Sequence, residues 1–409
     1  MQRLSVLDNG LRVITREMPS VETAAVGLHC DVGSRRERAE QNGLAHLYEH
    51  MVFKGAGGRS ARELAETVED VGGDLNAMTG REGTVFSARL LADDLALGVD
   101  LIADMILDPH FDEVELEREK AVVAQEMAEV NDTASDLVFD DLQQAAYPEQ
   151  PIGRSILGTL DTLRGLTRED LIEWRDINYE PESLIVVAAG AVEHERLTDL
   201  AEKRFGHLKP VDRPAVESAA FRPQAIDRTR PTEQVHITMG WEGPAIAEPG
   251  LLAARLFGEA VGGGMSSRLF QELREERGLA YTVFASHAPF MDSGLFSVYA
   301  ATAPGDTAAA RELILDVLAG AADDLEMREL DRAKALAKAG LLMALESCEG
   351  QAGYIARQLL VHSRIVEPHE VVENLDRLTL DEVRAAGKAV LESGQALAVI
   401  GAGHGLALP

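Results

Sequence analysis

Two stretches of the chain, one in each half, have nearly the same pattern of residues. DTLRGLTREDLIEW (161–174) is matched by ENLDRLTLDEVRAA (373–386). Each is followed by an apolar run that is typical of a buried strand, SLIVVAAGAV (183–192) and QALAVIGAG (395–403). The distance between the two copies is about half the chain, which is too long for a solenoid repeat. The pattern therefore predicts that one domain has been duplicated.

The length of the chain agrees with this prediction. A chain of 409 residues exceeds what one hydrophobic core usually holds, so at least two domains are expected. Residues 204–233 contain four prolines and mixed charges, which is typical of a linker. We expect an N-terminal domain over 1–205, a linker over 206–230 and a C-terminal domain over 231–409.

Strand-like runs and long helical patterns both occur in the first half. Residues 60–72 and 113–130 have helical patterns, whereas residues 1–18 alternate around the turn signal Asp8-Asn9-Gly10. The beginning of the chain is expected to form a β-hairpin rather than a signal peptide. The mixture predicts α/β or α+β domains, each with a sheet that helices cover.

Composition limits the partners of the chain. The net charge of −30 argues against binding to nucleic acid, which needs a basic protein surface. It is compatible with a positively charged substrate, and the alternative is that the charge serves only solubility. No apolar run is long enough for a membrane span, so no membrane partner is expected. Cys30 and Cys348 are the only cysteines, which argues against a disulfide framework and makes a cytoplasmic location the default expectation.

The stretch GLAHLYEHMVFKG (43–55) carries the residues with the clearest chemistry. His46 and His50 are one helical turn apart, so both imidazoles project from one face and can hold Zn²⁺. Glu49 lies near that face, where a carboxylate can deprotonate a zinc-bound water. This H-x-x-E-H order is the reverse of the H-E-x-x-H zinc motif. The alternative is that neighbouring groups satisfy all three side chains, although an apolar helix makes unpaired polar groups costly.

A third ligand has to come from another element. Glu119 and Glu126 are two helical turns apart in the predicted helix over 113–130, so they share a face. A carboxylate on a partly apolar face favours a cation or a proton as its partner. The alternative for Glu126 is an ordinary surface glutamate.

The second half lacks an equivalent of the histidine motif. No histidine occurs between Gly250 and Gly264, so the duplicate is not expected to bind zinc in the same way. The glycine-rich VGGGMSSRL (261–269) lacks the pattern of a phosphate-binding loop, so nucleotide binding is not expected either.

The stretch 43–55, followed by Glu126, resembles the pitrilysin family of zinc peptidases, and especially half-length members such as mitochondrial processing peptidase and its bacterial relatives. The resemblance includes GGDLNAMTGREGTVFSARL (72–90) and GGGMSSRLFQELREERGLAYTVFAS (262–286), and it spans almost the whole chain. It implies an α+β fold class, with two homologous, duplicated domains joined by a linker. Each domain would be a mostly antiparallel sheet covered by helices.

The resemblance also implies the roles of individual residues around a metal. His46, His50 and Glu126 look like the ligands of one Zn²⁺ per chain. Glu49 looks like the general base, and Glu119 looks like an acidic residue that supports one of the ligands.

Further residues look like substrate contacts by the same resemblance. Asn76 would lie near the scissile bond, with Ala77 and Thr79 of the same predicted edge strand as substrate-binding residues; the alternative is an ordinary hairpin. Arg274 and Tyr281 resemble the arginine–tyrosine pair of the family, which donates to the oxyanion; the alternative is a surface arginine and a core tyrosine.

The expected function is a zinc-dependent endopeptidase that hydrolyses unfolded peptides or presequence-like segments in a closed chamber. Full-length relatives carry four such domains, whereas this chain has two, so a homodimer is expected. The acidic charge would favour basic peptides. The alternatives are a non-catalytic structural or assembly subunit of the same fold and a chain that needs a second, different subunit.

Overall fold

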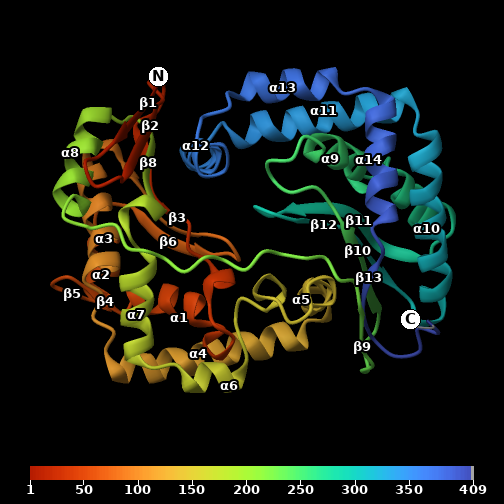
Figure 1. Cartoon of the computed structure of the whole chain (residues 1–409), viewed down its shortest axis with the longest axis horizontal. Helices are drawn as coiled ribbons and strands as arrows, with labels where there is room; N and C mark the ends of the chain where they lie inside the picture. Colours follow the sequence, from red (N-terminus) through yellow and green to blue (C-terminus); the bar gives the residue numbers. More distant parts are fainter. Residues whose placement is uncertain (407–409) are drawn as a thin grey trace. The chain divides into compact units, whose positions relative to one another are not determined.

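The computed structural model describes residues 1–406, whose contacts divide the chain into two compact units (Figure 1). Unit 1 contains residues 1–127, 155–216 and 344–365, and unit 2 contains residues 128–154, 217–343 and the chain from 366 onward. Each unit has one main sheet with helices packed on it. Two homologous α+β domains are thereby confirmed.

The sheet of unit 1 has six strands in the order β1-β2-β8-β3-β7-β6. Only β2 and β8 pair in parallel, so the sheet is mostly antiparallel, as expected. The hairpin predicted at the beginning of the chain is confirmed, with Val6 opposite Arg12. The strands are β1 (Gln2–Val6), β2 (Arg12–Glu17), β3 (Thr23–Cys30), β6 (Asp74–Thr79), β7 (Thr84–Leu91) and β8 (Leu184–Gly190).

The helices of unit 1 bury their apolar faces against this sheet and against each other. The helix over 168–178 begins where the sequence motif places it, because Thr167 and Asp170 form a capping box. The helices are α1 (Leu44–Val52), α2 (Ala61–Glu69), α3 (Leu95–Leu107), α4 (Glu113–Asp132), α6 (Leu160–Gly165), α7 (Arg168–Asn178), α8 (His194–Phe205) and α12 (Cys348–His362), and a small hairpin of β4 (Gly55–Ala56) and β5 (Arg59–Ser60) follows α1.

The sheet of unit 2 has five strands in the order β11-β12-β10-β13-β9, with only β13 and β9 in parallel. The strands are β9 (Ala225–Arg228), β10 (Val235–Glu242), β11 (Ala280–Pro289), β12 (Gly294–Thr302) and β13 (Ala396–Ile400). The helices are α5 (Ala134–Ala146), α9 (Leu251–Gly262), α10 (Thr307–Asp324), α11 (Met327–Ala344), α13 (Pro368–Arg377) and α14 (Leu380–Glu392), and a π-helical turn, η6, covers Phe270–Glu276.

The two halves of the sequence exchange one helix each. α12 comes from the second half, yet its residues Ile355 and Leu359 pack on Ile185 and Val187 of β8 in unit 1. α5 comes from the first half and packs on the alternate residues of β13 in unit 2, such as Ala398. Each central strand is therefore buried on both faces, which explains its continuous apolar sequence.

The units consequently differ from the continuous division into 1–205 and 231–409. The expected linker over 206–230 also differs in its last part, because residues 207–224 form neither helix nor strand, whereas residues 225–228 form β9. This strand has two charged residues in four and pairs only at the edge of the sheet, beside β13. Within residues 1–406, no helix is both long enough and apolar enough to cross a bilayer.

Candidate metal centre

The N-terminus of the helix α1, which carries the histidine motif, is hydrogen-bonded to a buried carboxylate. The side chain of Glu37 is 3% exposed, and its two oxygens accept hydrogen bonds from the backbone N–H groups of Gly43 at 3.0 Å and Ala45 at 2.7 Å. Negative charge at a helix N-terminus is stabilising because the free N–H groups point at it. Gly43 has φ of 99°, and a Cβ there would lie 2.6 Å from the carbonyl oxygen of Leu157, so only glycine fits. Glu37 thus fixes the start of α1.

His46 and His50 lie on one face of α1, as predicted, and Glu126 of α4 faces both. The Nε2 atoms of His46 and His50 lie 3.8 Å and 3.7 Å from Oε2 of Glu126. Two ligands of one tetrahedral zinc are about 3.3 Å apart, so the spacing is close to that of a zinc site. These three residues form the group in residues 1–406 that could hold a metal ion, with their ligand atoms within 4.8 Å of one another.

The protonation of His46 suits metal binding. Burial, with a smaller contribution from the neighbouring His50, lowers the pKa of His46 to about 4. The imidazole is therefore neutral at pH 7 and can offer a lone pair. Its Nδ1 is buried and has no hydrogen-bond partner, while Nε2 faces Glu126.

Glu119 lies behind His50. Its Oε2 is 3.1 Å from Nδ1 of His50, and its Oε1 is 2.7 Å from Nζ of Lys54. A carboxylate that accepts a hydrogen bond from Nδ1–H fixes the tautomer in which Nε2 is the free lone pair. This position allows the supporting role that the resemblance implies, and the role itself stays a prediction.

Glu49 lies on the same helix, one residue before His50. Burial raises the pKa of its carboxyl group, and hydrogen bonds from Thr79 partly offset this effect. Its Oε2 is buried without a hydrogen-bond partner. A raised pKa brings a carboxylate closer to the range in which it can both accept and return a proton at neutral pH.

The strand β6, which carries Asn76, Ala77 and Thr79, is the last strand of its sheet and packs against α1. Asn76 is exposed, and its Oδ1 accepts a hydrogen bond from the N–H of Ala77 at 2.8 Å. The strands predicted around the turn at 80–83 are confirmed as β6 and β7. An edge strand next to the metal centre has backbone groups available for pairing with another chain.

In unit 2, Arg274 and Tyr281 are brought together although they lie on different elements. Arg274 belongs to η6 and Tyr281 to β11, and the guanidinium carbon lies 4.8 Å from the centre of the Tyr281 ring. The same carbon lies 4.7 Å from the ring of Phe270. Tyr281 is 70% exposed, which contradicts the alternative of a core tyrosine. The stacking holds both donor groups at the surface of unit 2.

Comparisons with known proteins agree with this geometry. Residues 12–160 match the family model described as "Insulinase (Peptidase family M16)", and residues 165–336 match "Peptidase M16 inactive domain". A protein of Rickettsia felis named "Uncharacterized zinc protease" is 33% identical, over 97% of each chain. This chain belongs to peptidase family M16. The resemblance to half-length pitrilysin-type zinc peptidases is thereby confirmed.

Other relatives and solved structures support the family and the fold. The "Uncharacterized zinc protease YmxG" of Bacillus subtilis is 32% identical, over 96% of each chain. A crystal structure titled "peptidase M16 inactive domain" from Pseudomonas fluorescens has a TM-score of 0.91, with 21% identity over 100% of this chain and 99% of that one. A protease from Helicobacter pylori has a TM-score of 0.91, with 22% identity over 98% and 99%. The two structures show the same fold.

Every residue predicted for the metal centre lies in one cluster in unit 1, so the His-His-Glu group of this M16 chain is compatible with zinc. Sequence reasoning missed Glu37. The only signal in the sequence was that an acidic residue precedes a predicted helix. Because several residues lie between Glu37 and the start of α1, the sequence does not show which backbone N–H groups the carboxylate reaches. The absence of the histidine motif in the second half agrees with the "inactive domain" description of its match.

Proposed function

We propose that this protein is a zinc-dependent endopeptidase that hydrolyses unfolded peptides. The observation that carries the proposal is the convergence of His46, His50 and Glu126, with Glu119 fixing the tautomer of His50. Glu49 is next to this group and has a raised pKa. Relatives named zinc proteases support the same chemistry.

In the proposed reaction, three residues would bind zinc, one would transfer protons and one strand would bind the peptide. His46, His50 and Glu126 would hold one Zn²⁺, which supplies the Lewis acid that polarises a scissile carbonyl and acidifies a water. Glu49 would accept the proton of that water and deliver it to the leaving amine. Asn76 and the backbone of β6 would hold an extended peptide with little regard to its sequence.

Arg274 and Tyr281 would donate hydrogen bonds to the carbonyl oxygen as it gains negative charge. We propose that the protein is a homodimer, in which each site uses the zinc ligands of one chain and Arg274 with Tyr281 of the other. This arrangement would enclose the substrate in a chamber with four domains, the number that full-length relatives have in one chain.

The decisive experiment measures bound zinc and the cleavage of an unfolded peptide by the wild type and by Glu49→Gln. The expected result is about one zinc per chain in both proteins and loss of cleavage only in the variant. A chelator should abolish wild-type cleavage, and added zinc should restore it. Bound zinc without cleavage by the wild type would instead support the non-catalytic subunit or the need for a second subunit.

The shared site has its own test. Glu49→Gln and Arg274→Ala chains, each nearly inactive, are mixed under conditions that allow subunit exchange. Partial recovery of cleavage supports sites that combine two chains, because some mixed dimers then contain one complete site. No recovery despite confirmed exchange would show that each chain works alone.

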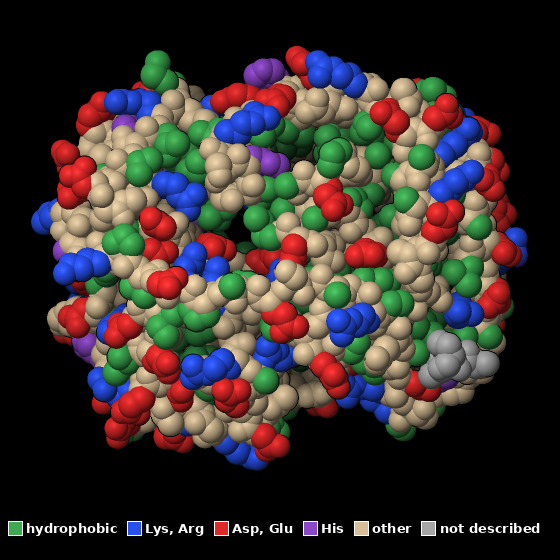
Figure 2. All heavy atoms as spheres, viewed as in Figure 1, with side chains coloured by type: hydrophobic (Ala, Val, Ile, Leu, Met, Phe, Trp, Pro, Cys, Tyr) green, Lys and Arg blue, Asp and Glu red, His purple; other side chains and the backbone are tan. Residues whose placement is uncertain are grey.

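The preference for basic, presequence-like peptides rests on the net charge of −30. On the face drawn in Figure 2, acidic and basic side chains are interspersed, with acidic residues over much of the surface. An acidic protein attracts basic peptides, and salt weakens this attraction. Cleavage of basic peptides should therefore be faster than that of acidic peptides of equal length at low salt, and equal rates would contradict the preference.

A further inference from the structure

The strand β6 pairs with β7 on one side and forms the edge of the sheet on the other. At the end of the pairing, the N–H of Gly80 donates to the carbonyl oxygen of Gly83 at 2.8 Å. Residues of an antiparallel pair alternate between hydrogen-bonded and non-hydrogen-bonded positions. Because Gly80 is hydrogen-bonded, Ala77 and Thr79 direct their N–H and C=O groups away from β7, toward the free edge.

These two N–H groups of the free edge donate to side chains of the same chain. The N–H of Ala77 donates to Oδ1 of Asn76 at 2.8 Å. The N–H and the hydroxyl group of Thr79 both donate to the carboxylate of Glu49. Oε2 of Glu49 is buried without a hydrogen-bond partner, so both bonds from Thr79 are accepted by Oε1. The carboxylate is thus held at one oxygen only.

The side chain of Thr79 lies on the face of β6 that α1 covers. Side chains alternate along a strand, and here Asn76 and Met78 are exposed, whereas Ala77 packs against the core of unit 1. Thr79 follows Ala77 by two residues, so it shares the face that contacts α1. Its hydroxyl group therefore points at Glu49 and not along the free edge, where a peptide would pair.

Unit 2 repeats this hairpin in β11 and β12 but changes the residue at the position of Thr79. The turns at 80–83 and 290–293 have equal length, and in each the N–H of the first residue donates to the carbonyl oxygen of the last at 2.8 Å. The strand residue before the turn is Thr79 in unit 1 and Pro289 in unit 2. Proline has neither an N–H nor a hydroxyl group, so both donors are absent from this position of unit 2.

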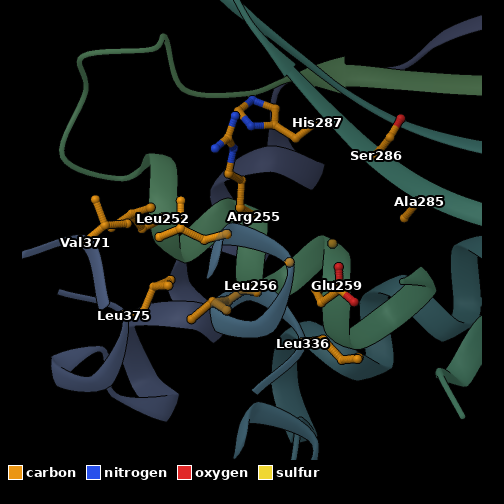
Figure 3. Close-up of a pocket in the computed structure, with 14 residues that line it drawn as sticks. Leu252, Arg255, Leu256, Glu259, Ala285, Ser286, His287, Leu336, Val371 and Leu375 are labelled. Atoms are coloured by element: carbon orange, nitrogen blue, oxygen red, sulfur yellow. The ribbon is translucent and has the colours of Figure 1, made fainter. Parts of the chain in front are cut away.

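The carboxylate is also absent from the helix that packs on this hairpin in unit 2. α9 contacts β11 as α1 contacts β6, and the burial patterns of the two helices match when Phe257 is aligned with Tyr48. Glu49 then corresponds to Gly258. Gly258 and Ser286 line a cavity of about 450 Å³ beside β11 (Figure 3). The proposed base and its two donors are therefore present together in unit 1 and absent together in unit 2.

We propose that Thr79 is a positioning residue for Glu49: its hydroxyl and N–H groups hold Oε1, which leaves Oε2 to accept and return the proton. Two donors on one oxygen fix the carboxylate more firmly than one, because hydrogen bonds to a charged group are strong. The proposal rests on the proposed peptidase function and gives Thr79 a role other than substrate binding. A peptide that pairs with β6 can replace the exposed bond between Asn76 and Ala77, and its pairing ends before Thr79.

The test compares Thr79→Val, which keeps the shape of the side chain without its hydroxyl group, with Thr79→Ser, which keeps the hydroxyl group. Thr79→Val should lower kcat for peptide cleavage at least roughly tenfold, with zinc content and KM unchanged. Thr79→Ser should restore most of the wild-type kcat. Binding of the same peptide to the inactive Glu49→Gln protein, measured by calorimetry, should not change when Thr79→Val is added, because the side chain of Thr79 does not hold the peptide.

Crystal structures of the metal-free wild type and Thr79→Val give a readout that needs no cleavage. The carboxylate of Glu49 should occupy one position in the wild type and should be displaced, or occupy several positions, in Thr79→Val. Thr79→Ser should return it to the wild-type position. An unmoved carboxylate in Thr79→Val would overturn the proposal.

The matched control is Thr229→Val, which removes an exposed hydroxyl group that lies 3.5 Å from a carboxylate oxygen of Asp227. It should leave kcat, KM and the position of Glu49 unchanged. An unchanged kcat in Thr79→Val, an equal loss in Thr79→Ser, or weaker peptide binding when Thr79→Val is added to Glu49→Gln would each contradict the positioning role. A wild type that binds zinc and cleaves no peptide would instead refute the peptidase function, so the two failures differ.

Discussion

Glu119 holds His50 and Lys54 at the same time: one carboxylate oxygen lies 3.1 Å from Nδ1 of His50, and the other lies 2.7 Å from Nζ of Lys54. The carboxylate is 5% exposed, so both contacts are shielded from water. These two contacts connect α4 to the face of α1 that carries His50 and to Lys54, which follows that helix. The position of His50, a proposed zinc ligand, therefore depends on Glu119, which is not itself in the His-His-Glu group.

Glu119→Gln should weaken zinc binding by roughly 10- to 100-fold, because an amide accepts the Nδ1–H hydrogen bond less strongly than a carboxylate. Competition with a zinc-binding dye measures the affinity. Glu117→Gln on the same helix is the control, since the Glu117 side chain is 72% exposed. Equal zinc affinities of the two variants would show that Glu119 does not support the ligand.

Glu37→Gln should lower the free energy of unfolding by about 1–3 kcal/mol, because an amide offers one acceptor oxygen where the carboxylate uses two. Urea unfolding, followed by the midpoint at constant slope, measures the change. Glu40→Gln is the control, because its side chain is 72% exposed in the same loop. An unfolding midpoint of Glu37→Gln equal to that of the control would remove Glu37 from the capping of α1.

Tyr281→Phe should reduce kcat while zinc content stays the same, because it removes the donor hydroxyl and keeps the ring that stacks on Arg274. Arg274→Gln should reduce kcat by roughly 10²- to 10³-fold, as expected for an oxyanion donor. Arg277→Gln, at a side chain that is 54% exposed, serves as the control. Unchanged kcat in Tyr281→Phe would leave the ring with a purely structural role.

The stability of unit 1 should fall as the pH decreases from about 6.5 to about 4. His29 of β3 pairs with Ile185 on the face of the sheet that α12 covers, and burial lowers its pKa to about 4. In this range the unfolded chain binds a proton at His29 and the folded chain does not, so acid favours unfolding, by up to about 3 kcal/mol.

The measurement is the difference in unfolding free energy between the wild type and His29→Gln at several pH values. The wild type should lose more stability than the variant between pH 6.5 and 4. His207→Gln, at an exposed histidine, should behave like the wild type. Parallel curves for the wild type and His29→Gln would contradict the prediction.

The sequence predicted those features of the candidate site that follow from the spacing of residues along one helix. The positions of His46 and His50 on one face, and of Glu119 and Glu126 on another, follow from the period of a helix. The roles of the two glutamates required the family resemblance, because helical spacing places both on the same face. The structure separates them by distance, since Glu119 contacts Nδ1 of His50 while Glu126 faces Nε2.

Long-range packing could not be predicted in the same way. An apolar stripe on α5 or α12 indicates that the helix is buried, but it does not indicate which sheet the helix covers. Both α5 and α12 cover a sheet that is built mainly from the other half of the sequence.

The exchange of α5 and α12 has a consequence for how the chain can be divided. A fragment that ends near residue 216 would lack α12, so Ile185 and Val187 would be exposed to water, and its own α5 would lack the strand it packs on. Neither half is expected to be stable alone. A protease nick within residues 207–224 should leave two pieces that stay associated and renature only in each other's presence.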